Sequence, residues 1–99
     1  MATDQLPPGL IPASHSLTFT ADTVPAPLQQ EHALGPGHWG VLRILEGSVC
    51  FVNLATGEET EKTAPGEVII EPGVPHKLRL TGPLRCRIDF FREPDDETK

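Results

Sequence analysis

The spacing of the glycines limits most of this chain to short strands. Apart from Gly40, the glycines from Gly37 to Gly82 recur every seven to ten residues, and Pro65 and Pro72 strengthen two of these breaks. A strand of ordinary length fits between such breaks, whereas an ordinary helix does not. The spacing therefore predicts a β-rich fold.

The segments between the breaks have the composition of β-strands. They are rich in β-branched or aromatic residues, or they alternate between apolar and polar residues. Residues 16–20 and 27–34 can add two more strands upstream. Roughly eight short strands in one small domain are typical of an antiparallel sandwich or jelly-roll barrel. The other strands are expected at residues 38–46, 48–54, 58–63, 67–71, 76–80 and 84–91.

Length and charge restrict the domain organisation and the partners. The 99 residues are expected to form one domain, with an irregular arm at residues 1–14 and a solvated acidic tail at residues 94–99. A formal net charge of -6 argues against nucleic acid and against an anionic membrane surface as partners. No lysine or arginine precedes Arg43 and no apolar run is long enough to span a membrane, so a cytoplasmic protein is expected.

The two cysteines and the sheet edges lead to two further expectations. Cys50 and Cys86 are too few for a disulfide framework and lack a CxxC spacing. We expect them to be small buried hydrophobic residues, with a disulfide between them as the alternative. Because exposed sheet edges are commonly covered by pairing with a second copy, a homodimer is expected.

Alternation along two predicted strands points two histidines toward the interior. His76 shares one face of residues 76–80 with two leucines. His32 shares a face of residues 27–34 with two leucines, if that segment is a strand. A buried imidazole without hydrogen-bond partners costs about 1 to 3 kcal/mol, so each ring needs a partner. A divalent metal is one such partner, and a hydrogen bond within a turn is another.

Two motifs carry a resemblance to the cupin superfamily. The segment "GEVIIEPGVPH" resembles the second conserved cupin motif, and "HALGPGHWGVLRILEGSV" is similar to the first. Together with "IEPGVPHKL" and "RIDFFR", the stretch from Phe19 to Val49 resembles a small cupin family associated with tellurite resistance. Its members occur alone or fused to an S-adenosylmethionine-dependent methyltransferase. The resemblance runs from about Leu6 to Arg92 and implies a double-stranded β-helix, the cupin form of the jelly-roll barrel.

The resemblance also implies metal ligands. By position, His76 is the ligand of the second motif and His32 is the remaining histidine of the first motif. The first motif lacks a His-x-His pair and a glutamate near Gly40, so either His38 or Glu71 is left to supply a third ligand. A divalent ion such as Zn, Fe or Ni is expected; two histidines and a carboxylate suit Fe(II), and zinc accepts a similar set with water.

Three hypotheses of function follow from these residues. The first is a small-molecule-binding or stress-response module, in which His32 and His76 hold an ion that an anionic ligand, such as an oxyanion, approaches. The second is a metal-dependent oxygenase or isomerase with the same site. The third is a structural domain without metal, in which both histidines are hydrogen-bonded. Trp39 can form an aromatic wall of the pocket or belong to the core, and the sequence identifies no catalytic residue.

Overall fold

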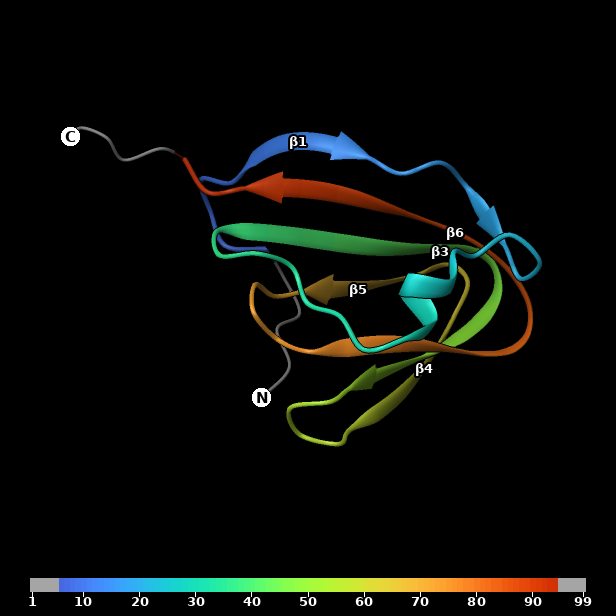
Figure 1. Cartoon of the computed structure of the whole chain (residues 1–99). Coiled ribbons are helices and arrows are strands. Elements are labelled where there is room, and N and C mark those ends of the chain that lie inside the picture. The colour runs from blue at the N-terminus through green and yellow to red at the C-terminus, as the bar shows by residue number, and fades with distance from the viewer. Residues whose placement is uncertain (1–5, 95–99) are drawn as a thin grey trace.

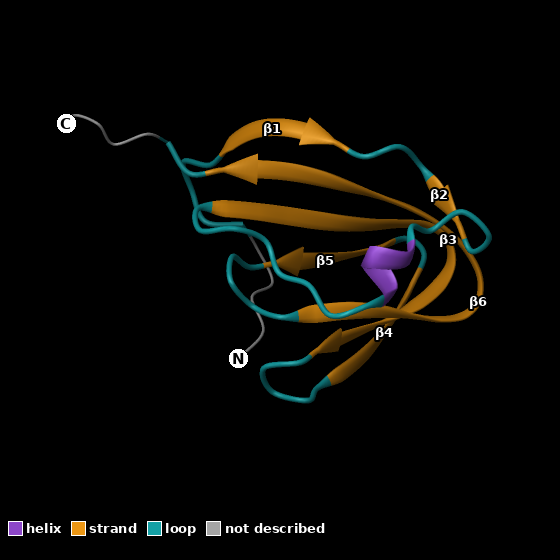
Figure 2. Ribbon diagram, viewed as in Figure 1, coloured by secondary structure: helices purple, strands orange, loops and turns teal. Residues whose placement is uncertain are grey.

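Two long antiparallel strands, β3 (His38–Asn53) and β6 (His76–Arg92), pair with all the other strands of the sheet. The structure is a computed structural model that describes residues 6–94. The strand order is β1-β6-β3-β4, with β2 also paired to β6 and β5 also paired to β3. The shorter elements are β1 (Ile11–His15), β2 (Phe19–Thr20), a 3-10 helix η1 (Ala26–Gln29), β4 (Glu59–Thr63) and β5 (Gly66–Ile70) (Figures 1 and 2).

Bulges bend β3 so that the sheet folds back on itself. The register against β6 shifts between Ile44 and Glu46 and again between Gly47 and Val49. Bulges of this kind bend a strand and increase its twist. As a result β5 pairs with the first half of β3 and β4 with the second half, and the two halves form an upper and a lower layer in Figure 1.

The core lies between these two layers. Leu42 and Val49, from the two halves of β3, are fully buried. Cys50 and Cys86 are both buried and unbridged, as expected from the sequence. The core cluster consists of Val24, Leu42, Ile44, Val49, Ile70, Leu78, Leu84, Cys86 and Ile88.

The structure confirms an all-β antiparallel fold but differs from the expected strands in three places. Gly47 and Gly82 do not end strands, since they lie within β3 and β6. Residues 27–34 are not a strand: the chain forms η1 after Pro25, and His32 pairs only through an isolated bridge to His76. Proline suits the first turn of a helix and removes a donor from a strand, which accounts for the difference.

The expected N-terminal arm is in part a strand. Residues 11–15 form β1, which pairs with the C-terminal end of β6. Pro12 is accommodated because β1 lies at the edge of the sheet and the register shifts between Pro12 and Ser14. Residues 1–5 of the arm and residues 95–99 of the expected tail lie outside the described residues.

The sheet does not close into a barrel over residues 6–94. Both β4 and β5 pair with β3, but no ladder joins these two strands to each other. The expected jelly-roll barrel is therefore not confirmed. Within the same residues, no helix is long and apolar enough to cross a membrane.

Candidate functional site

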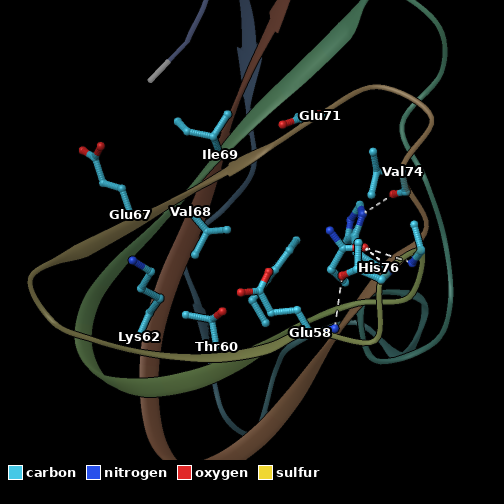
Figure 3. Close-up of a pocket in the computed structure, with 13 residues that line it drawn as sticks. Glu58, Thr60, Lys62, Glu67, Val68, Ile69, Glu71, Val74 and His76 are labelled. Atoms are coloured by element: carbon cyan, nitrogen blue, oxygen red, sulfur yellow. Dashed lines mark hydrogen bonds between the residues drawn. The ribbon is translucent and has the colours of Figure 1, made fainter. Parts of the chain in front are cut away.

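A cavity of about 590 Å³ lies between β4 and β5, where the sheet is open. Figure 3 shows Lys62 and Thr60 on the β4 side, Val68 on the β5 side and His76 at the far end from Lys62. Sites for small organic molecules have volumes in this range. The lining residues are Phe51, Asn53, Ala55, Thr56, Glu58, Thr60, Lys62, Glu67, Val68, Ile69, Glu71, Val74 and His76.

The pairing of β4 with β3 decides which side chains of β4 face the cavity. Thr60 pairs with Phe51 and Lys62 pairs with Val49, which belongs to the core and is fully buried. Paired residues of adjacent strands project from the same face of a sheet. Thr60 and Lys62 therefore face inward, and the glutamates that alternate with them are exposed.

Both predicted metal-ligating histidines have one ring nitrogen bound to a backbone carbonyl. The Nδ1 atom of His76 lies 2.9 Å from the carbonyl oxygen of Val74, a contact drawn in Figure 3. The Nδ1 atom of His32 lies 3.2 Å from the carbonyl oxygen of Gln30. Because a carbonyl oxygen only accepts hydrogen bonds, each Nδ1 carries the proton. In the neutral rings, Nε2 is then the nitrogen with a lone pair.

The structure brings His32 and His76 side by side even though His32 is not part of a strand. Each backbone N–H donates to the carbonyl oxygen of the other residue, at 3.0 and 2.9 Å. The ring centroids are 4.2 Å apart in an edge-to-face arrangement, and Phe51 stacks on His76 at 5.3 Å. The two imidazoles and the phenyl ring thus form one packed group beside the cavity.

Burial controls the protonation of His76. Its exposed fraction is 2%. Burial lowers the pKa of His76, the carbonyl of Val74 opposes this by holding the Nδ1 proton, and the charge of His32 lowers the pKa further. The ring is therefore neutral at pH values near 7 and keeps Nε2 as an acceptor.

Neither residue expected as a third ligand forms a group with the two histidines. His38 is exposed at the start of β3, whereas His76 pairs with the last residue of that strand. Glu71 follows β5 and lines the cavity. Over residues 6–94, no group of three or more His, Cys, Asp and Glu side chains is arranged to hold a metal ion. The metal site stays a prediction.

The aromatic and charged residues of the cavity differ from those expected. Trp39 is not among the lining residues, and its indole Nε1 donates a hydrogen bond to Glu93 Oε2 at 3.2 Å. The cavity is instead lined by the phenyl ring of Phe51, and Lys62 is the lysine among its lining residues. Sequence reasoning missed Lys62 because both faces of "EETEKT" are polar, so alternation alone gives no inward side.

The TehB-like domain family model matches residues 15–88, which is more than half of the chain. The chain belongs to the TehB-like domain family. The predicted relation to tellurite-resistance proteins is thus confirmed at the level of the family, and the cupin assignment is not confirmed. A comparison of this TehB-like domain with curated proteins finds no match.

Two solved structures are similar to this TehB-like domain. TehB from Haemophilus influenzae matches with a TM-score of 0.80 and 27% identity, over 90% of this chain and 33% of TehB. The domain therefore spans about a third of the length of TehB. A protein from Escherichia coli K12 matches with a TM-score of 0.84 and 21% identity, over 94% of this chain and 100% of that protein. The second likeness concerns the fold alone.

Proposed function

We propose that this TehB-like domain binds a small organic molecule in the cavity between β4 and β5. The observation that supports the proposal is the cavity itself, about 590 Å³ in volume and bounded at one end by the buried ring of His76. Ligand sites combine mostly apolar walls with a few placed polar groups. Here Phe51 and Val68 supply apolar surface, while Thr60 and Lys62 supply a hydroxyl and a cation.

The stacked rings give the bound molecule a flat wall. Phe51 lies nearly parallel to His76, with an angle of 23° between the ring planes. A planar ligand placed against Phe51 would bury apolar surface on a wall that His76 holds rigid. His76 itself is fixed at Nδ1 by Val74 and at its backbone by His32. The wall is therefore preformed, which reduces the entropy cost of binding.

Nuclear magnetic resonance on ¹⁵N-labelled protein tests this proposal. We expect small aromatic and aliphatic molecules, added one at a time, to shift the amide signals of Phe51, Thr60, Val68 and His76. Signals from β1, which does not line the cavity, serve as the control. Shifts confined to β1 or spread evenly over the chain would contradict binding in the cavity.

A metal ion held by His32 and His76 is a second candidate function. It is supported by the hydrogen bonds from both Nδ1 atoms to backbone carbonyls, because metal-binding imidazoles are usually oriented in this way. The two Nε2 atoms would be the ligand atoms. The remaining ligands would come from water or from the bound molecule. A bound ion would supply Lewis-acid chemistry for an isomerase reaction, and a redox-active ion such as Fe(II) would supply the electron transfer to O2 that an oxygenase reaction requires.

Elemental mass spectrometry on protein purified without an affinity tag tests the metal candidate. We expect near-stoichiometric metal in the wild type and its loss in His32→Ala and His76→Ala. His15→Ala is the matched control, because His15 is exposed on β1. A wild type that carries no metal and takes none up on reconstitution would leave both rings with the structural role that their hydrogen bonds already describe.

Two broader proposals concern ancestry and assembly. The two sequence motifs support membership of the cupin superfamily, and with it a stress-response role.

The unpaired edges of β1 and β4, which end the strand order, support a homodimer. Sedimentation of the purified protein at high concentration is expected to give twice the mass of the chain, and a clean monomer would contradict the dimer.

A further inference from the structure

We propose that Lys62 makes the cavity a site for organic monoanions. A carboxylate of the ligand pairs with the Lys62 ammonium, and its apolar body lies against Phe51 and Val68. The inference rests on the proposed function, because it names the chemical class that the same cavity takes.

The position of Lys62 sets it apart from the other charged residues of the sheet. It pairs with the core residue Val49 and so projects from the inner face of β4 into the cavity. Over residues 6–94 the ion pairs are made by arginine, and Lys62 has neither an ion pair nor a side-chain hydrogen bond. Lys77 also lacks an ion pair within that range, but it alternates with the buried His76 and Leu78 and so projects from the opposite face of the sheet.

The nearby carboxylates do not neutralise Lys62. Glu67 pairs with Arg43, the residue opposite it in the β5–β3 ladder, on the face away from Val68. Figure 3 shows Glu71 at the other end of the cavity from Lys62. Glu58 is exposed in the turn before β4 and lines the rim. Lys62 is the one lysine or arginine among the lining residues, and Glu58, Glu67 and Glu71 are the carboxylates. The ammonium of Lys62 can therefore pair with a single negative charge, while the carboxylates repel a second.

The surroundings of Lys62 define the rest of the ligand. Thr60 lies two residues before Lys62 on the same face of β4, so its hydroxyl can donate to the second carboxylate oxygen. Beyond it, the Phe51 ring and the Val68 side chain provide apolar contact. This combination suits an aromatic or branched aliphatic monocarboxylate. It does not suit a small inorganic oxyanion, which has no apolar part to bury.

Three probes of nearly equal shape and different charge test the inference. Phenylacetate is an anion, phenylacetamide is neutral and phenethylamine is a cation, and the dissociation constant of each is measured from the amide shifts of the cavity residues. We expect phenylacetate to bind about tenfold more tightly than phenylacetamide, a factor equal to about 1.4 kcal/mol. We expect phenethylamine to bind most weakly and inorganic phosphate not to compete with phenylacetate.

The variant Lys62→Met is expected to bind phenylacetate no better than phenylacetamide. Lys77→Met makes the same change in charge on the outer face and is expected to keep the wild-type preference. If Lys62→Met fails to fold, the comparison of the three probes on the wild type decides the question. The role of Lys62 would be overturned if wild type bound phenylacetate and phenylacetamide equally, or if it bound phenethylamine most tightly. Binding in the cavity would still stand in either case. No shift at the cavity with any probe would overturn both.

Discussion

The buried imidazole of His76 joins the core of the domain to the wall of the cavity. Its ring contacts Phe51 on one side and His32 on another, and its Nδ1 proton is held by Val74. Since burial lowers the pKa of this ring, protonating it in the folded state costs free energy. At the scale of the single residue, the domain should therefore respond to acid through His76.

We predict that the free energy of unfolding decreases as the pH falls from about 7.5 to about 5.5. The folded pKa of His76 lies below its unfolded value of 6.5, so below that value the unfolded state binds more protons than the folded state. The stabilisation is thus fully present above the unfolded pKa and is lost as the pH falls toward the folded pKa. Urea unfolding at a series of pH values measures the free energy of unfolding.

The control for this prediction is a variant that cannot titrate at residue 76. His76→Gln is expected to show a smaller pH dependence than the wild type, whereas His15→Ala, which removes an exposed histidine, is expected to keep it. An identical pH dependence in His76→Gln and wild type would show that another group is responsible.

At the scale of the element, the bend of β3 depends on Gly47. Its φ is 77°, and an added Cβ would lie 1.9 Å from the carbonyl oxygen of Pro83 in β6. A left-handed conformation costs a residue with a Cβ about 1 to 2 kcal/mol. At Gly47 the clash with backbone adds to that cost, because neither strand can move without breaking the ladder.

We predict that Gly47→Ala destabilises the domain by clearly more than about 2 kcal/mol. Gly57→Ala is the matched control, because Gly57 also has a positive φ, 81°, but an added Cβ there meets nothing within 4 Å. Gly57→Ala is expected to cost only the conformational term, about 1 to 2 kcal/mol. Thermal and urea unfolding compare the variants, and equal costs at both sites would contradict the role assigned to the close approach of Pro83.

Gly47 also shows how far the sequence predicts these elements. The glycine spacing predicts strands correctly, but a glycine that ends a strand and one that forms a bulge have the same local sequence signal. The difference depends on Pro83, which is distant in sequence.

The alternation of apolar and polar residues correctly placed His76 on the inner face of its strand. For His32 it reached the right position from an incorrect strand, since backbone hydrogen bonds to His76, not a ladder, hold it there.

At the scale of the whole molecule, the cavity follows from the failure of the sheet to close. The bend of β3 directs β4 and β5 into different layers, and no ladder joins them within residues 6–94. The space between them has a core-facing floor with Phe51 and a polar side with Lys62. The sequence could not locate this space, because it depends on which half of β3 each short strand joins.

The proposed binding site lies in a chain with a net charge of -6. A uniformly acidic domain would repel an anionic ligand, so the proposed binding of an anion depends on the inward position of Lys62. We therefore predict that salt weakens the binding of phenylacetate more than that of phenylacetamide, because only the charged probe depends on the ion pair. Dissociation constants at low and high ionic strength measure this, and the same salt dependence for both probes would contradict it.

Filling the cavity tests most directly whether it is the binding site. Thr60→Phe places a ring in the cavity beside Phe51, its partner in the β3–β4 ladder, and Glu61→Phe places the same ring on the outer face of the same strand. Calorimetric titration of phenylacetate into wild type and both variants, with folding checked by circular dichroism, is the measurement. We expect Thr60→Phe to fold and lose binding, while Glu61→Phe binds as the wild type does. Undiminished binding by a folded Thr60→Phe would show that the ligand binds elsewhere.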